Sequence, residues 1–146
     1  CYNPLKLVVP KGNPENITCL DDLIGKKVTC GVGGNETDML KEMYPNGEVE
    51  IIPVETGNLL QVTTGKTSAC VQGAAASAVE IKDNDLPLEI VGDTIYLEED
   101  AYAFAKTKRG AALKEKVDAA LNEMHEDGTL TKLATQWFGY DISVEE

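Results

Sequence analysis

Residues 26–43 of this chain have the sequence KKVTCGVGGNETDMLKEM. The apolar run that comes first predicts a buried strand, and the segment after it has helical spacing and ends before Pro45. Between them, Gly31, Gly33 and Gly34 permit a tight turn whose backbone N–H groups can approach a ligand closely. A strand, a glycine turn and a helix in this order are typical of α/β domains, but alone they identify no ligand.

The same alternation continues along the chain. We expect strands at residues 5–9, 26–32, 49–54, 68–73 and 88–93, with helices at residues 19–23, 35–43, 58–64 and 74–82. Thr18, with Asp21 three residues on, is placed to cap the first helix, and Thr56 is placed to cap the third. The alternation predicts an α/β fold with a mostly parallel, flavodoxin-like sheet flanked by helices.

The C-terminal part has a different pattern. Residues 101–107 predict one more strand, and an apolar stripe at helical spacing then runs over residues 111–127. A second short helix at residues 130–138 carries Leu133 and Trp137 on one side. Because no further strand follows, we expect these helices to cover a second sheet that the chain does not contain.

The composition argues against several classes of function. The 146 residues include 13 lysines and arginines and 25 acidic residues, and the net charge of −12 repels nucleic acid and anionic lipid. The 42% hydrophobic content can form the core of one compact domain. No apolar run approaches the ~20 residues that cross a bilayer, and no leader-like segment opens the chain, so we expect no signal peptide in it. The GKT of residues 65–67 lacks the upstream glycine of a P-loop.

The titratable residues predict neither a metal site nor catalysis. The cysteines Cys1, Cys19, Cys30 and Cys70 and the single His125 lack the spacing of metal ligands, and we expect no cofactor. Cys30 and Cys70 fall in predicted strands, where buried cysteine acts as a plain apolar side chain. If these strands are neighbours the two sulfurs could be close, and the sequence leaves their redox state open.

Two predicted turns, at residues 31–35 and 73–75, have unusually small side chains and follow the carboxyl ends of strands. If those strands are neighbours, both turns open on one crevice, which is where α/β sheets bind ligands. The backbone N–H groups of Gly34, Asn35 and Glu36 would then suit a carboxylate at the positive end of a helix. The alternative is that the glycines only permit the turn and that Asn35 is an ordinary helix cap.

Three stretches together resemble a known family. They are TCLDDLIGKKVTCGVGGNETDMLKE (residues 18–42), TGKTSACVQGAAASAVE (64–80) and YLEEDAYAFAKTKRGAALKEKVDAALNEMHEDGTLTKLATQWFG (96–139). In order and spacing they resemble the extracellular solute-binding proteins of amino-acid ABC transporters, family 3, which have the type II periplasmic-binding-protein fold. The most specific parts are DDLIGKKV and EDGTLTKLATQWFG.

This resemblance implies one lobe of a two-lobed protein that closes on its ligand about two hinge strands. The implied parts are a hinge-strand region (1–11), an α/β second lobe (12–100), a returning hinge strand (101–109), C-terminal helices (110–139) and a tail (140–146). In the family these helices pack on the first lobe, which this chain lacks. The remaining candidates for a cover are exchanged tails in a domain-swapped dimer, a partner chain, or refolding onto this lobe.

The resemblance also implies a ligand site. Its residues would be Gly31, Gly33, Gly34, Asn35, Glu36, Gly73 and Ala74. The family's hydroxyl residue in the first turn is replaced at Gly34, with Asn35 beside it. The family's aspartate for the ligand ammonium corresponds to Gly73, which has no carboxylate, so the identity of the ligand stays open. The family's carboxylate-clamping arginine belongs to the absent lobe, and Arg109 does not match it.

The function implied is capture of a small polar, carboxylate-bearing solute, an amino acid or an analogue, in an interlobe cleft. The implied partner is an ABC-transporter permease, and the implied location is extracellular or periplasmic, with membrane association through the full-length protein. No enzyme activity is expected. The alternatives are a sensor or receptor ectodomain lobe and a dehydratase-like enzyme on the same scaffold, for which Glu36 is the only charged candidate at the turn.

Overall fold

The computed structural model describes residues 1–144 and divides the chain into two compact units. The α/β unit comprises Pro4–Leu97, and the C-terminal unit comprises Cys1–Asn3 together with the chain from Glu98 onward. The chain therefore passes between the units twice, once near each end of the α/β unit.

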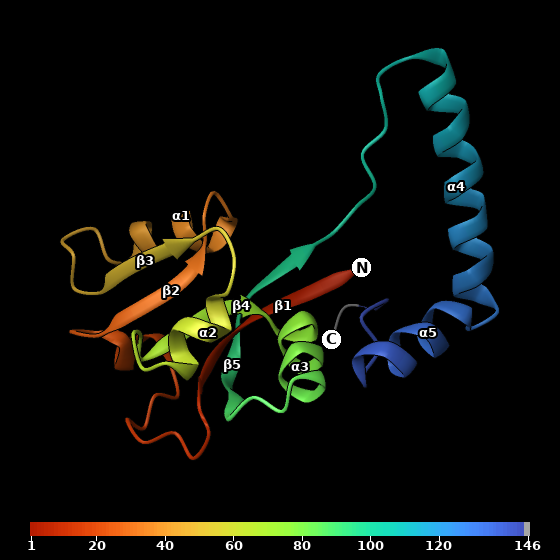
Figure 1. Cartoon of the computed structure of the whole chain (residues 1–146). Helices are drawn as coiled ribbons and strands as arrows, with labels where there is room; N and C mark the ends of the chain where they lie inside the picture. The colour runs from red at the N-terminus through yellow and green to blue at the C-terminus, as the bar shows by residue number, and fades with distance from the viewer. Residues whose placement is uncertain (145–146) are drawn as a thin grey trace. The chain divides into compact units, whose positions relative to one another are not determined.

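Apart from the strand predicted at residues 101–107, the elements follow the predicted order (Figure 1). They are β1 (Tyr2–Pro10), the 3-10 helix η1 (Leu20–Leu23), β2 (Lys27–Gly31), α1 (Asn35–Met43), β3 (Glu50–Val54), α2 (Asn58–Thr63), β4 (Ala69–Gly73), α3 (Ala74–Asp83), β5 (Leu88–Glu99), α4 (Lys108–Glu126) and α5 (Thr129–Phe138). Both crossings between the units occur inside a strand, one in β1 and one in β5.

The five strands form one sheet in the order β3-β2-β4-β1-β5. β2 is parallel to both β3 and β4, because α1 and α2 provide the crossovers that parallel neighbours require. β1 precedes the first crossover helix and pairs antiparallel with β4, with Leu5 opposite Gly73. The predicted α/β fold with a mostly parallel sheet is confirmed for this central part.

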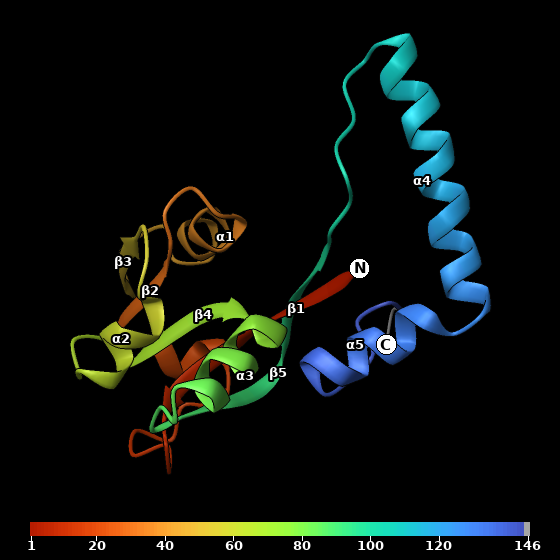
Figure 2. The same ribbon diagram turned by 45° about the vertical axis from the view of Figure 1, so that its right-hand side comes forward.

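Two apolar clusters cover the two faces of the sheet, since successive strand residues point to opposite sides. Leu5, Leu7 and Val9 of β1 belong to the larger cluster, whereas Val8 belongs to the smaller one. The larger cluster takes its helical residues from η1 and α1, and the smaller one takes them from α2, with α3 packed against it. Figure 2 shows α2 and α3 together on the side of the sheet away from α1.

The same alternation separates the two buried cysteines. β2 and β4 are neighbours, but Cys70 pairs with Thr29, one position before Cys30. Cys30 therefore lies in the larger cluster and Cys70 in the smaller one, on opposite faces of the sheet. The two sulfurs, which the sequence left open as neighbours, thus do not share a face of the sheet, and all four cysteines are free thiols.

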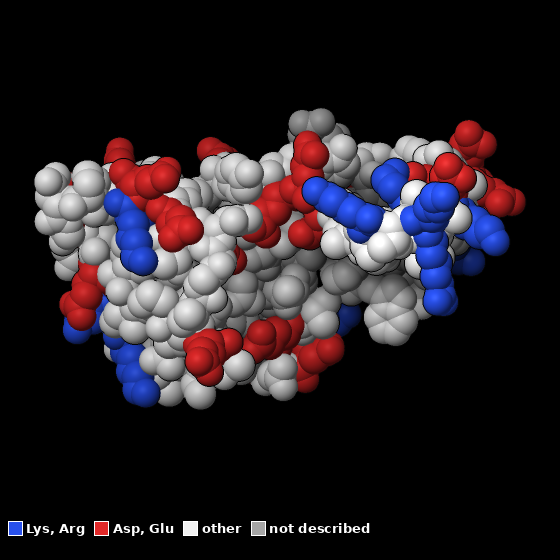
Figure 3. Space-filling view, turned by 90° about the horizontal axis from the view of Figure 1, so that it is seen from above, with Lys and Arg blue, Asp and Glu red and all other residues white. Residues whose placement is uncertain are grey.

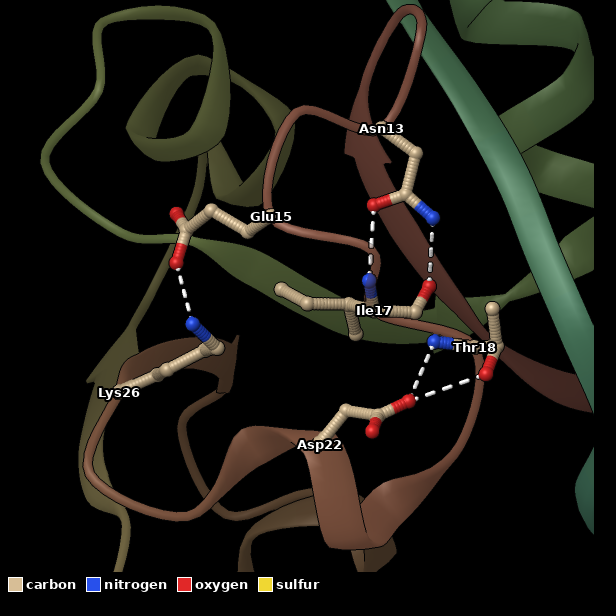
Figure 4. A network of polar contacts seen from close by, with 6 residues as sticks. All are labelled: Asn13, Glu15, Ile17, Thr18, Asp22 and Lys26. Carbon is tan, nitrogen blue, oxygen red and sulfur yellow. Dashed lines mark hydrogen bonds and ion pairs between the residues drawn. The ribbon is translucent and has the colours of Figure 1, made fainter.

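Two predicted helix caps are also wrong. Cys19 is the N-cap residue of η1, and the acid that closes this turn is Asp22 instead of Asp21. The Asp22 carboxylate accepts hydrogen bonds from the Thr18 backbone N–H at 2.8 Å and from the Thr18 hydroxyl at 3.0 Å (Figure 4). These bonds, the backbone bond first, lower the pKa of Asp22 to about 2.

The third predicted helix, α2, begins one residue later than a cap at Thr56 would place it. Its N-cap residue is Gly57, whose φ of +78° lies in the left-handed region that glycine adopts most easily. Thr56 precedes this residue and forms no described cap. The helix still ends as predicted before Gly65.

The strand predicted at residues 101–107 is absent from the structure, where residues 101–106 have no strand pairing. β5 instead extends to Glu99, well beyond the predicted residues 88–93. Thr107 becomes the N-cap of α4 and accepts a hydrogen bond from the Gly110 backbone N–H at 3.1 Å. The turn is tight, because a Cβ atom on Gly110 would lie 2.0 Å from the Ala105 carbonyl oxygen.

Candidate functional site

The two small-residue turns lie at the same edge of the sheet. β2 ends at Gly31 and β4 ends at Gly73, and these strands are parallel neighbours in the register Val28–Ala69 and Thr29–Cys70. From β2, the chain crosses to β3 on one side and later returns to β4 on the other. The gap between β2 and β4 is therefore the point where the strand order reverses, which is the usual ligand position in open α/β sheets.

The first turn is built around its glycines. After Gly31, Val32 donates its backbone N–H to the Val54 carbonyl at 3.1 Å and so continues the ladder with β3. Gly33 then takes a φ of +70°, and extended Gly34 is the N-cap residue of α1. Asn35 is the first residue of α1, so the interpretation of Asn35 as an ordinary cap is wrong.

The side chain of Thr37 connects this turn to the end of β2. Its hydroxyl donates to the Gly31 carbonyl at 2.6 Å and lies 3.0 Å from the Cys30 sulfur. Thr37 and Cys30 are both buried, and burial is the main reason that the pKa of the Cys30 thiol is raised. The negative charge of Glu36 raises that pKa further.

The second turn has a matching connection. Gly73 is both the last residue of β4 and the N-cap residue of α3, which begins at Ala74. The Ser77 hydroxyl donates to the Gly73 carbonyl at 2.8 Å, and Ser77 is fully buried. In each turn, therefore, a hydroxyl from the first turns of the helix satisfies the carbonyl at the end of the strand.

Asn58 and Gln72 form a third feature of this edge. Asn58 is the first residue of α2, and its side-chain N–H group donates to the Gln72 side-chain oxygen at 3.1 Å. Gln72 directly precedes Gly73. The other polar atom of the amide, Asn58 Oδ1, is inaccessible to solvent and has no hydrogen-bond partner within residues 1–144.

Sequence reasoning missed Thr37, Ser77, Asn58 and Gln72. A hydroxyl residue in the first turns of a helix that follows a strand is a weak signal, and Thr37 and Ser77 both carry it. Nothing in the local sequence marks the Asn58–Gln72 contact, because it joins residues from two different elements.

Glu36 lies over the first turn. A Cβ atom placed on Gly34 would be 2.1 Å from Glu36 Oε2, so the carboxylate occupies the space that a side chain at Gly34 would need. Among residues 31–37 and 72–77, Glu36 is the only charged residue. Residues 1–144 contain no group of three or more histidine, cysteine or acidic residues positioned to hold a metal ion.

A cavity of about 610 Å³ lies elsewhere, within the C-terminal unit. Its walls are mostly apolar and come from the start of the unit, from α4 and from α5: Cys1, Asp100, Ala101, Tyr102, Phe104, Lys114, Asp118, Leu121, Leu130, Leu133, Ala134, Trp137, Phe138, Ile142 and Ser143. None of the predicted ligand residues lines it. We call it the apolar groove.

The described helices include none that is long and apolar enough to span a membrane. Acidic side chains are scattered over the face of the molecule shown in Figure 3 and do not form one patch. The features that distinguish the site at the ends of β2 and β4 are its backbone geometry and the charged side chain of Glu36.

Comparison with known proteins agrees with the fold. Residues 1–140 match the family model of bacterial extracellular solute-binding proteins, family 3. The chain is 37% identical to a probable amino-acid-binding protein, YxeM, of Bacillus subtilis, covering 99% of this chain and 55% of the relative. It is 29% identical to the L-cystine-binding protein TcyJ of Escherichia coli, covering 95% of this chain and 52% of the relative.

Among solved structures, the chain is similar to a probable amino-acid ABC transporter extracellular-binding protein, YtmK, of Bacillus subtilis. The TM-score is 0.80 at 28% identity, and the match covers 94% of this chain and 60% of that structure. The chain spans about half the length of the curated relatives it matches. The relatives named here are binding proteins, and none is described as an enzyme.

Proposed function

Because the chain belongs to the bacterial extracellular solute-binding proteins of family 3, we propose that it is the second lobe of a solute-binding protein that delivers a small polar solute to an ABC-transporter permease. The observation that carries this proposal is the pair of small-residue turns at the one position where the strand order reverses. The proposed location is outside the cytoplasmic membrane.

The proposed ligand residues are Gly31, Gly33, Gly34, Asn35, Glu36, Gly73 and Ala74. The start of α1 supports this assignment, because its backbone N–H groups and helix dipole favour an anionic group such as a carboxylate. The hydroxyls of Thr37 and Ser77 support it too, since each bonds the carbonyl at the end of its strand and so holds the turn beside the helix start. The proposed solute is an amino acid or an analogue.

The ligand would be captured in a cleft between this lobe and a first lobe, with closure about the two crossings in β1 and β5. The relatives are about twice as long as this chain, which supports a protein with a further lobe. Closure would provide much of the affinity, because one lobe alone makes only part of the contacts and immobilises the solute less well.

The apolar groove supports the same arrangement. Trp137 is 66% exposed and Tyr102 is 72% exposed, and both line this groove. Apolar surface of this kind marks a contact with another protein segment. The proposed cover is a first lobe; a second copy of this chain that exchanges its tail is the alternative.

The 146-residue chain itself tests the proposal. In nuclear magnetic resonance titrations with single amino acids, we expect weak, millimolar binding that shifts the backbone amides of Gly33, Gly34 and Gly73. The amides of Gly25 and Gly65, in other turns, serve as an internal control and should not move. Shifts at the control amides alone, or a tight one-to-one complex of this chain in calorimetry, would contradict the proposal.

A further inference from the structure

We propose that Asn46 is a site of deamidation, a covalent modification that converts it to aspartate or isoaspartate, and that Glu48 slows this reaction in the folded chain. The proposal is independent of the proposed function, because it concerns a turn at the other end of the sheet. Neither the family match nor the names of the relatives assign a role to these two residues.

Asn46 lies in the turn between α1 and β3. Gly47 donates its backbone N–H to the Tyr44 carbonyl at 3.2 Å, which closes a β-turn with Asn46 as its third residue. Tyr44 and Val49, on either side, are 8% and 3% exposed. The Tyr44 hydroxyl also donates to the Leu20 carbonyl at 2.6 Å. The turn is thus anchored at both ends, while Asn46 and Gly47 between them are exposed.

The sequence of this turn favours deamidation, and it is the only asparagine–glycine pair in the chain. In the reaction the Gly47 backbone nitrogen loses its proton to water and attacks the side-chain carbonyl carbon of Asn46. A C–N bond forms to that carbon, its bond to Nδ2 breaks, and the leaving group takes a proton from water and departs as ammonia. Water then opens the resulting succinimide at either carbonyl, which leaves aspartate or isoaspartate. Glycine favours the attack because no Cβ atom stands beside its nitrogen.

Glu48 holds Asn46 through two hydrogen bonds. Its Oε1 atom accepts from the Asn46 side-chain N–H group at 2.9 Å, and its Oε2 atom accepts from the Asn46 backbone N–H at 3.1 Å. The side-chain bond is the largest cause of the lowered pKa of Glu48. Release of Nδ2 as ammonia breaks this bond, and deprotonation of the Gly47 nitrogen breaks its bond to the Tyr44 carbonyl. The folded turn therefore opposes a reaction that its sequence favours.

The modified turn would lie far from the proposed ligand residues along the strands. It leads into Glu50, the first residue of β3, whereas the turn proposed to bind the solute follows Gly31, which pairs with Val54 at the other end of β3. Deamidation adds a negative charge beside Glu48 and, in isoaspartate, one more carbon atom to the backbone. It should therefore disturb the start of β3 and leave the proposed ligand turn unchanged.

The competing explanation is that Glu48 accelerates the reaction by accepting the proton of the Gly47 nitrogen as a base. In the structure that N–H is bonded to the Tyr44 carbonyl instead. The two explanations predict opposite effects for Glu48→Gln. An amide has one acceptor oxygen in place of two, so this variant keeps at most one of the two bonds to Asn46.

The experiment incubates the full chain in mildly alkaline buffer, folded and in guanidinium chloride. Peptide mass spectrometry follows the conversion of Asn46 over days, and chromatography separates aspartate from isoaspartate. Asn84 is the internal control, because it is exposed, donates its side-chain N–H to the Glu80 carbonyl at 3.0 Å and is followed by Asp85 instead of glycine. Glu42→Gln is the control variant, since Glu42 is an exposed acid of α1.

In the folded, unaltered chain Asn46 should convert at least about fivefold faster than Asn84. Glu48→Gln should accelerate conversion of Asn46 at least about threefold, because it weakens a charge-assisted hydrogen bond, whereas Glu42→Gln should leave the rate unchanged. In guanidinium chloride the unaltered chain should itself convert faster at Asn46, and Glu48→Gln should no longer differ from it.

Conversion of Asn46 no faster than that of Asn84 in the folded chain would overturn the modification site. A rate in folded Glu48→Gln that equals or falls below that of the unaltered chain would overturn the restraining role of Glu48. If this variant does not fold, the unaltered chain decides the point alone, because a rate that does not rise in guanidinium chloride would overturn the restraint by the folded turn.

Discussion

The α/β unit buries its apolar side chains, whereas the C-terminal unit leaves large apolar side chains exposed. In the α/β unit, Leu5, Leu7 and Leu40 are at most 1% exposed and belong to a continuous core. In the C-terminal unit, Leu113 and Trp137 are 52% and 66% exposed, although both follow the helical spacing of a buried stripe. The difference teaches that an amphipathic pattern predicts a helix and a face, but not that the same chain covers that face.

The α/β unit therefore buries its own core, whereas α4 and α5 expose apolar side chains that the described part of the chain leaves uncovered. Hydrophobic stabilisation is roughly proportional to the area removed from water, so the two units should respond very differently to the same substitution.

Leu40→Ala should lower the free energy of unfolding by about 2–5 kcal/mol, because it removes a fully buried side chain and leaves a cavity. Leu113→Ala makes the same chemical change on the exposed face of α4 and should cost less than about 0.5 kcal/mol. Urea denaturation followed by circular dichroism measures both values. Equal losses of unfolding free energy in the two variants would show that α4 is covered in solution and would contradict the difference between the two units.

The thiols give a second contrast. Cys1 and Cys19 are exposed and should react at once with Ellman's reagent in the native chain. Cys30 and Cys70 are fully buried, and burial is the main cause of the raised pKa of each thiol, so their reaction should be at least about a hundredfold slower and should wait for unfolding. Four thiols reacting together in the native chain would mean that the core of the α/β unit is not closed.

Trp137 is the only tryptophan of the chain and reports on the apolar groove. In the 146-residue chain its fluorescence should be red-shifted and easily quenched by acrylamide, because most of the ring is exposed. In a longer protein that contains a first lobe, emission should shift to the blue and quenching should fall. A blue-shifted emission of the chain at high concentration that reverses on dilution would instead indicate a second copy as the cover.

Asp22 gives the smallest expected effect. Its pKa is lowered from 3.8 to about 2 by hydrogen bonds that form only in the folded state, so it adds stability above pH 4 that is lost as the pH falls through 2. Between pH 4 and pH 2 the melting temperature should fall less in Asp22→Asn than in the unaltered chain. The difference should be a few degrees at most, since the carboxylate is exposed. Asp21→Asn, at the neighbouring exposed position, should leave the acid response unchanged.

The local sequence was sufficient to predict those elements that depend on residues near one another in the chain. The glycines of residues 31–34 predict a strand, a turn and a helix because few other residues allow that backbone, and the structure has all three. β2 and β4 are also neighbours, which was the condition for both turns to lie at one place. The alternation of strands and helices limits the possible orders of the sheet but does not select this one.

The errors concern relationships between elements. The separation of Cys30 from Cys70 depends on a shift of one residue in strand register, which no local pattern records. The strand predicted at residues 101–107 has β-favouring residues, but β-propensity needs a neighbour to pair with, and the sheet offers none there. Asn58 and Gln72 were missed for the same reason, because their contact joins α2 to β4.

The hydroxyls of Thr37 and Ser77 have a consequence for how this lobe can diversify. They place these side-chain bonds outside residues 33–36, the stretch proposed to bind the solute. Substitutions at residues 34–36 can therefore alter the polar groups of this turn while the scaffold beneath it persists, whereas the φ of +70° at Gly33 favours glycine there. A combinatorial library confined to those positions should consist mainly of folded variants with different preferences, whereas one that includes Thr37 and Ser77 should lose the fold in many members.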